Sequence, residues 1–482
     1  MLSKSHPVTP KSHRPAKPRL LGYCSALAIV LIPVSQMQAR AQNASPAERY
    51  TLERTIKEAL EASTDIQTAT RIVQVDRKQA EAELARLKPS LQLDANAARY
   101  DGDTVISISG VPPITVLKDH SETVTLGASL DLDVFGQVRR AASQSTLQSL
   151  ADQMNLVSIR NARILYAANV YYTLLRSEHQ VEVAQAALTT ARQQQATALK
   201  LNLGQVGQKI DVLRANTQVA DSEQELTSAR NNLAIAHNNF NDLVGRALDM
   251  PLQAEDVPGV TVGVAITTEK KNDDKSSTPP FEVSIDSTDH LDVAGSVRGA
   301  LQRRPEVLAA QIQVRSAETG IKLARGGLDP TLSLSAGGNY YPTTSFQSPR
   351  QSTAEIGINF SIPLYDSGAT RARVESARLQ SDNAKSILDR RRKDVALEVR
   401  QAYLNLAASA RQIGTANTGL TQAIAARRLA QARYEGQVGL YLEITDAQSA
   451  LIQAETSQVN AVYGYLIARA QFENAIGAPA MK

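Results

Sequence analysis

The chain has 482 residues, of which 21% are charged and 4% aromatic, and it contains no tryptophan. Its formal charge of +4 arises in residues 1–41, which hold six of the 52 lysines and arginines and no acidic residue. The rest has 46 basic and 48 acidic residues, so its charge gives no reason to expect nucleic-acid binding. The single cysteine, Cys24, also lies within residues 1–41, so disulfides and thiolate chemistry are not expected after them.

Residues 1–41 have the layout of a secretory signal peptide. A basic stretch precedes an apolar run at 20–34, and Ala39-Arg40-Ala41 supplies small residues for cleavage after Ala41. A membrane anchor is the alternative, but the run is shorter than the roughly 20 apolar residues that span a bilayer. No later segment is apolar enough for a transmembrane helix, so we expect an exported periplasmic, secreted or β-barrel protein.

The remainder of the chain is a tandem repeat. An offset of 241 residues maps Pro89 to Pro330, and an offset of 232 residues maps Gly136 to Gly368. The sharpest match pairs Gly204-Gln205-Val206-Gly207 with Gly436-Gln437-Val438-Gly439. Internal repeats of this kind indicate two copies of one structural unit. The predicted organisation is a signal peptide at 1–41, a first repeat at 42–245, a flexible segment at 246–290 and a second repeat at 291–482.

Each repeat is predicted to contain a helix, two strands, a long helix, a turn and a return helix. Residues 138–203 include no proline or glycine, and their repeat counterpart, 369–434, is interrupted only by Gly414 and Gly419. At about 1.5 Å per residue these helices are on the order of 100 Å long. Apolar residues at three- and four-residue spacing predict coiled-coil packing. We expect residues 51–87 to form one helix that stacks end to end with the return helix, 208–244.

The strands alternate between apolar and polar residues, within 91–97, 124–134, 332–336 and 356–364. This period is typical of tilted strands in a membrane barrel, with lipid outside and water inside, although an ordinary half-buried sheet shows it too. Four strands are too few to close a barrel alone, since the smallest single-chain barrel has about eight. Alternation predicts a set of polar side chains that face the barrel lumen: Asp94, Asn96, Asp131, Asp133 and Asn359.

Motifs of enzymatic chemistry are not found. The sequence lacks a phosphate loop, a dinucleotide fingerprint and a nucleophile elbow. The histidines share no ligand spacing, so we expect neither a metal site nor a cofactor, and no enzyme.

The motifs around the second repeat resemble the TolC-like outer-membrane efflux protein family. They are Ile362-Pro363-Leu364-Tyr365-Asp366-Ser367-Gly368 and the run from Tyr434-Glu435-Gly436 to Asp446-Ala447-Gln448. The resemblance covers essentially everything after residue 41 except the segment between the repeats. It implies an α+β membrane protein: a homotrimer with four strands per chain in a transmembrane β-barrel, and a long α-helical barrel that crosses the periplasm.

The resemblance also implies sites and partners. In the family the tip turns contact a periplasmic membrane-fusion (adaptor) protein, and an inner-membrane pump supplies the energy. The corresponding tip residues are Gly204, Val206, Gly207, Gly436, Val438 and Gly439. A tunnel constriction is expected nearby, with Asp211, Glu443 and Asp446 as candidates. The alternatives are turns in which glycine merely supplies left-handed backbone, and acidic residues on a solvated helix face.

Three functions follow as hypotheses, of which the third, a secreted enzyme, has almost no sequence feature in its favour. The first is a passive export channel in the outer membrane, which serves a tripartite efflux pump or a type I secretion system. The second is a periplasmic coiled-coil scaffold or adaptor that forms no channel. Aspartate at Leu126 or Ile358 separates the first two, because a scaffold would tolerate it and a lipid-facing strand would not.

Overall fold

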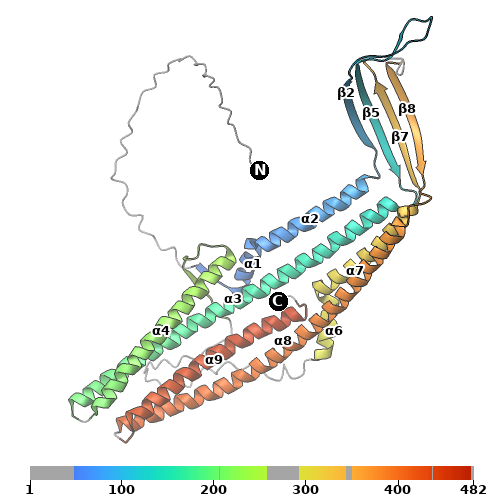
Figure 1. The fold of residues 1–482 in the computed structure, drawn as a ribbon. Helices are drawn as coiled ribbons and strands as arrows, with labels where there is room; N and C mark the ends of the chain where they lie inside the picture. The colour runs from blue at the N-terminus through green and yellow to red at the C-terminus, as the bar shows by residue number, and fades with distance from the viewer. Residues whose placement is uncertain (1–47, 206, 258–291, 343–349, 437, 479–482) are drawn as a thin grey trace, which may run out of the picture. The chain divides into compact units, whose positions relative to one another are not determined.

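The computed structural model describes residues 48–205, 207–257, 292–342, 350–436 and 438–478 (Figure 1). The predicted signal peptide, Val206 and most of the segment 246–290 lie outside these residues. In the described part of the chain, no helix is long and apolar enough to cross a membrane.

The two repeats have the same order of elements. The first contains α1 (Leu52–Ala62), α2 (Thr64–Ala85), β2 (Ser90–Arg99), β5 (His120–Leu132), α3 (Gln137–Leu203) and α4 (Lys209–Val244). The second contains α6 (Val293–Arg303), α7 (Pro305–Arg325), the 3₁₀ turn η2 (Gly326–Leu328), β7 (Thr331–Tyr340), β8 (Ser352–Ser361), α8 (Ala369–Glu435) and α9 (Tyr441–Ala475). The two long helices are therefore confirmed, with 67 residues each.

Two small sheets were not predicted. Strand β1 (Glu48–Tyr50) pairs in parallel with β6 (Leu252–Ala254), which follows the first repeat. Strands β3 (Thr104–Ile106) and β4 (Ile114–Leu117) form an antiparallel hairpin in the connection between the first two predicted strands.

The prediction of one continuous helix over residues 51–87 is wrong. The chain leaves the helical region at Ser63, where φ is −71° and ψ is 115°, and the Ser63 hydroxyl accepts a hydrogen bond from the Ile66 amide at 3.4 Å. Serine favours such a cap because its side chain replaces a missing intrahelical partner. The second repeat breaks at Arg304, with ψ 123°, since Pro305 excludes the helical region for the residue before it.

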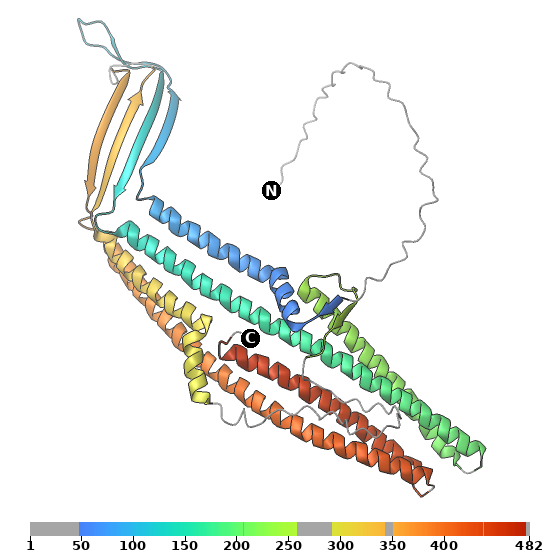
Figure 2. The same ribbon diagram turned by 180° about the vertical axis from the view of Figure 1, so that it is seen from behind.

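The strands and the helices that continue them are arranged in the same order. The sheet is antiparallel with strand order β2-β5-β7-β8. Helix α2 packs on α3, α3 on α7 and α7 on α8. The helices adjoining β2, β5, β7 and β8 therefore lie side by side in the same order as the strands (Figures 1 and 2). In the described part, β2 and β8 each have a second edge without a partner strand.

Each return helix packs against the long helix of its own repeat. Helix α4 packs along α3 and α9 along α8, while α2 covers another part of α3. A Cβ atom at Gly245, just after α4, would lie 3.2 Å from the Cβ of Ala62 at the end of α1. The ends of α1 and α4 therefore meet, in agreement with the stacking predicted from the helix lengths.

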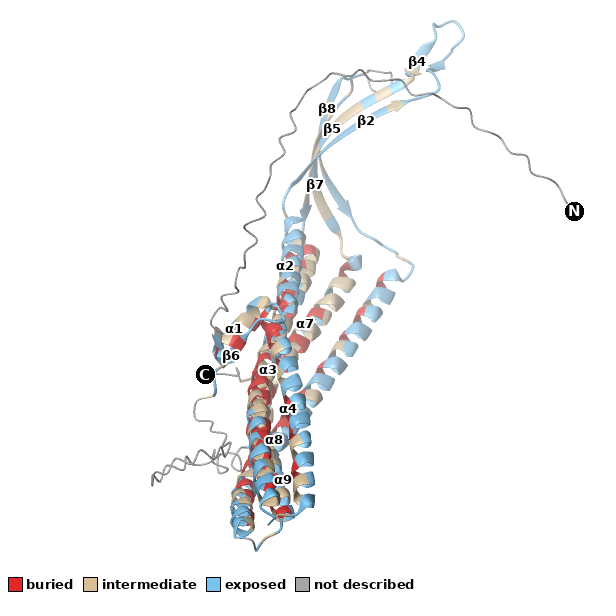
Figure 3. Ribbon diagram, turned by 90° about the vertical axis from the view of Figure 1, so that its left-hand side faces the viewer, coloured by how far each residue is buried: buried red, intermediate tan, exposed pale blue. Residues whose placement is uncertain are grey.

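The largest buried cluster lies among helices and not in the sheet (Figure 3). Tyr50, Tyr171, Phe240 and Tyr463 are its largest side chains, each at most 1% exposed. The Tyr171 hydroxyl lies 3.0 Å from the Tyr50 carbonyl and 2.5 Å from the Glu255 carbonyl, which ties β1 and the residue after β6 to α3. Burial raises the pKa of Tyr171, so its hydroxyl remains a donor.

Candidate functional site

One face of the four-stranded sheet is polar in every strand. Directly paired residues of an antiparallel sheet point to the same side. Asp94 pairs with Thr125, which pairs with Asn339, and the Thr125 hydroxyl donates to the Asn339 side-chain oxygen at 2.7 Å. Asp131 pairs with Ser333, which pairs with Asn359. Asn96 pairs with Thr123 on the same face.

The opposite face is apolar and exposed. Leu130 pairs with Leu334, which pairs with Ile358, and the row beside it joins Leu132, Leu332 and Phe360. Leu91, Ile356 and Ile358 are 77%, 82% and 72% exposed. An apolar face of this extent is unfavourable in water, because large apolar patches mark contact with lipid or protein.

Asp133 has a different role from the other residues predicted to face the lumen. It lies after the end of β5, and its carboxylate accepts hydrogen bonds from the amides of Val138 and Arg139, both at 3.0 Å. Its side chain is only 3% exposed. The carboxylate thus caps the first turn of α3, where unpaired amides favour an anion. In the second repeat Asp366 accepts from the amides of Gly368 and Thr370 in the same way.

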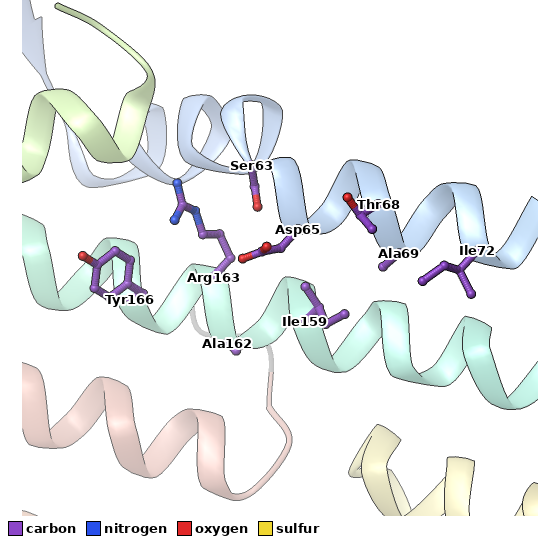
Figure 4. Close-up of a pocket in the computed structure, with 9 residues that line it drawn as sticks. All are labelled: Ser63, Asp65, Thr68, Ala69, Ile72, Ile159, Ala162, Arg163 and Tyr166. Atoms are coloured by element: carbon purple, nitrogen blue, oxygen red, sulfur yellow. The ribbon is translucent and has the colours of Figure 1, made fainter. Parts of the chain in front are cut away.

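Arg163 joins three helices halfway along α3. Its guanidinium donates to the carbonyls of Ala59 in α1 at 3.2 Å and Leu243 in α4 at 2.8 Å. Arg163 therefore satisfies carbonyl groups near the ends of both helices that meet there. It also borders a hollow of about 610 Å³ between α2 and α3, which Asp65 and Tyr166 line as well (Figure 4).

In the second repeat Arg304, which lies at the break between α6 and α7, likewise bonds to carbonyl groups at a helix end. Its side chain is 9% exposed and forms ion pairs with Glu306 at 3.0 Å and Glu398 at 2.9 Å. It also donates to the carbonyls of Asn474 and Ala475 at the end of α9. Our sequence reasoning missed both arginines. For Arg304 a signal existed, since a charged residue directly before a proline inside a helical pattern marks a break.

Hydrogen bonds from Ser158 connect this cluster to α3. The Ser158 hydroxyl donates to the Glu306 carboxylate at 2.6 Å. Burial opposes ionisation of Glu306, but the hydrogen bonds from Ser158, from the backbone and from Arg304 outweigh it and lower the pKa of Glu306. The carboxylate is therefore held ionised against Arg304.

In the tip turns, glycine allows the backbone of the turn to lie directly against the end of the preceding helix. The amides of Gly207 and Gly439 bond to the carbonyls of Leu201 and Arg433 at 2.9 and 3.0 Å. A Cβ atom at either glycine would lie 2.9 Å from a side-chain Cβ of the preceding helix. The interpretation that the tip glycines supply left-handed backbone is wrong for Gly204 and Gly436, whose φ angles are negative, and in the first turn Gln205 has a positive φ of 57°.

The glycines Gly204 and Gly436 end α3 and α8 with φ near −76° and −77°. Beside them, Val438 is 72% exposed and Leu440 is 66% exposed. The second tip turn therefore presents two apolar side chains to its surroundings.

The three acidic residues near the tip have different environments. Glu443 pairs with Arg433 of the same hairpin at 3.1 Å. Asp446 is exposed on α9 and forms no ion pair with any residue of the described ranges. Asp211, at the start of α4, acts electrostatically on Tyr434 and Tyr441 of the other hairpin.

Tyr441 belongs to a small buried cluster that joins the two hairpins, with Tyr434 beside it at a ring distance of 5.7 Å. Burial raises the pKa of Tyr441 to about 12, and Tyr434 and Asp211 contribute. The structure thus brings Asp211 and this tyrosine pair together across the two repeats. The tyrosines were not among the residues predicted for a constriction.

Sequence comparison agrees with this geometry. The profile of the family described as "Outer membrane efflux protein" matches residues 55–246 and 297–478. The chain belongs to the outer membrane efflux protein family. It is 23% identical over 430 residues to the solvent efflux pump outer membrane protein SrpC of Pseudomonas putida, over 88% of this chain and 85% of SrpC. It is 24% identical to TolC of Vibrio cholerae over 70% of this chain and 71% of TolC.

Solved structures of outer-membrane channels show the same fold. The outer membrane protein VceC of Vibrio cholerae superposes with a TM-score of 0.71 at 21% identity, over 89% of this chain and 97% of VceC. The MtrE outer membrane channel of Neisseria gonorrhoeae gives a TM-score of 0.69 at 21% identity, over 89% of both chains. The family model and the curated relatives place this efflux family protein in the outer membrane, with a periplasmic part.

Proposed function

We propose that this protein is the outer-membrane channel subunit of a tripartite efflux pump or a type I secretion system, and that it acts as a passive export duct. The observation that carries the proposal is the sheet, whose four strands share one polar and one exposed apolar face. Such a sheet separates lipid from an aqueous lumen. We assign Asp94, Asn96, Asp131 and Asn359 to that lumen.

Three copies of the chain close the barrel in this proposal. Hydrocarbon offers no hydrogen bonds to backbone groups, so the free edges of β2 and β8 require partner strands. Pairing β8 of one copy with β2 of the next gives a closed twelve-stranded barrel. Helices α2 and α8, which adjoin the two edge strands, support the same contact. Val75 of α2 and Leu404 of α8 are 63% and 62% exposed in the single chain, and contact between neighbouring copies would bury these apolar side chains.

The remaining organisation follows from this assembly. Residues 1–41 are removed on export, and residues 42–245 and 291–482 are the two repeats. The segment 246–290 joins the repeats beside the helices, and its first part is held by the pairing of β6 with β1. The helices form a periplasmic tunnel, whose tip meets a membrane-fusion adaptor protein. An inner-membrane pump supplies the energy, since the duct itself performs no chemistry.

The second tip turn is the adaptor contact in this proposal, together with Gly204 and Gly207 of the first. We expect Val438→Asp to abolish export, because a carboxylate would replace an exposed apolar side chain at the centre of the contact. Val438→Ile is the matched control and should export normally. Drug susceptibility and cross-linking to the adaptor measure the effect. Normal export by an assembled Val438→Asp variant would place the adaptor contact elsewhere.

The constriction is predicted from Asp211, Glu443 and Asp446, each present three times in the trimer. Rings of carboxylates favour cations in a narrow pore. We expect Asp211→Asn to reduce the preference for cations and to lower the cation conductance, because the ring loses its three carboxylates beside the tyrosine pair that joins the hairpins. Asp446→Asn, on an exposed part of α9, should change conductance less. Planar-bilayer recording of the purified trimer tests this, and a protein that never conducts would refute the channel.

A further inference from the structure

The junctions between helices and sheet carry an excess of positive charge. Five basic side chains there are exposed and form no ion pair with any residue that the structure describes. We call them the junction collar: Lys88, Lys322, Arg325, Arg371 and Arg373. They come from three of the four junctions, just before β2, before β7 and after β8.

The carboxylates at the same level are already engaged. Asp133 and Asp366 cap the long helices. Asp329 pairs with Arg140 at 3.4 Å, and Glu375 pairs with Arg378 at 3.2 Å. Within the residues that the structure describes, none of these carboxylates forms an ion pair with the collar.

The arginines also oppose the helix dipole. Both long helices start with arginines, Arg139 and Arg140 in α3 and Arg371 and Arg373 in α8, and neither has an acidic residue in its first turn. Cations are unfavourable at a helix N-terminus, where anions bind well. The capping carboxylates Asp133 and Asp366 already supply one anion at each N-terminus. Arg371 and Arg373 of α8 nevertheless have no ion-pair partner among the described residues, so an external anion would add one for them.

One part of the collar lines a hollow. Arg325 and Arg371 border a space of about 720 Å³ between α7 and α8, and Leu328 and Val374 provide its apolar wall. The ion pair of Arg378 and Glu375 completes the lining. A wall of this kind suits a ligand that has both an anionic group and an apolar part.

The neighbouring loops expose large apolar side chains. Leu364 and Tyr365, directly after β8, are 88% and 85% exposed, and Phe135, after β5, is 39% exposed. Aromatic side chains beside arginine and lysine are typical of the headgroup region of a membrane. The apolar face of the sheet ends at this same level.

We propose that the junction collar binds the phosphate groups of anionic phospholipids in the leaflet that faces the periplasm. This inference rests on the proposed insertion of the sheet in the outer membrane. Each collar cation near an anionic lipid surface adds attraction that salt weakens. The collar would fix the depth and orientation of the barrel from the periplasmic side.

The test uses the purified full-length protein in mixed micelles with phosphatidylglycerol or phosphatidylcholine, and native mass spectrometry counts the lipids retained by the oligomer. We expect selective retention of phosphatidylglycerol, reduced at least fivefold in the variant Arg325→Gln/Arg371→Gln/Arg373→Gln. The control Arg391→Gln/Lys393→Gln/Arg428→Gln removes equal charge from exposed sites elsewhere on α8 and should retain lipid normally. The variant Arg325→Lys/Arg371→Lys/Arg373→Lys keeps the positive charge and should also retain lipid. It therefore distinguishes a loss of charge from a loss of folding in the glutamine variant.

Two results would overturn the inference. Equal retention by the collar variant and the wild type would show that the collar does not hold lipid. A collar variant that changes ion selectivity but not lipid retention would place these arginines in the tunnel. The oligomer mass and conductance of the wild type, recorded on the same sample, show separately whether the channel itself is present.

Discussion

Replacing Ile358 by arginine is expected to abolish assembly of the protein in the outer membrane. Ile358 is 72% exposed on the apolar face of β8, where it pairs with Leu334. An arginine on the lipid face of a barrel costs roughly 2–4 kcal/mol near the bilayer midplane. The trimer would carry this cost in each of its three chains, and we expect no folded oligomer in the outer-membrane fraction.

The adjacent residue provides the matched control. Asn359 lies in the same strand but on the polar face, opposite Ser333. Asn359→Arg should therefore assemble and change only conductance. Semi-native electrophoresis of outer-membrane extracts distinguishes the oligomer from the monomer. Normal assembly of both variants would favour a periplasmic scaffold, which is the competing hypothesis.

Replacing Arg304 by methionine should cause the largest loss of stability among the helices. The change removes the partner of Glu306 and Glu398 and leaves the carbonyls at the end of α9 without a donor. Breaking a buried ion pair costs about 3–5 kcal/mol, and we expect the lower end because Glu398 is partly solvated. Arg303→Met, at the exposed neighbouring position, should be nearly neutral. Thermal unfolding in detergent, followed by circular dichroism, measures both.

The pH dependence of this cluster has a definite sign. The pKa of Glu306 is lower in the folded protein than its usual value of 4.5. The stabilisation is therefore complete above pH 4.5 and is lost as the pH falls through the lowered pKa of the folded state. The difference in stability between wild type and Arg304→Met should shrink in that acidic range. A difference that is constant down to unfolding would indicate that Arg304 acts by packing alone.

Local sequence determined the two long helices and the four strands of the main sheet. Residues 138–203 lack helix breakers, so their propensity and spacing required one long helix. Alternation alone gave the four strands and the identity of both faces, because side chains of a strand point to opposite sides with period two. The motif resemblance then supplied the family, which sequence comparison confirmed.

Only the tertiary structure decided how the elements are joined. The strand order β2-β5-β7-β8 depends on the pairing of β5 with β7, which joins residues at least 200 positions apart, and no local pattern encodes that pairing. The matching order of helices likewise needs the contact of α3 with α7 between the two repeats. The tertiary structure likewise gave Arg163 and Arg304 their roles, because their carbonyl partners belong to other helices. The caps at Ser63 and Asp133, in contrast, bond to amides only a few residues further along the chain. The roles of the two arginines depend on which unpaired backbone group lies near, because a buried helix end must find a partner wherever the fold places one.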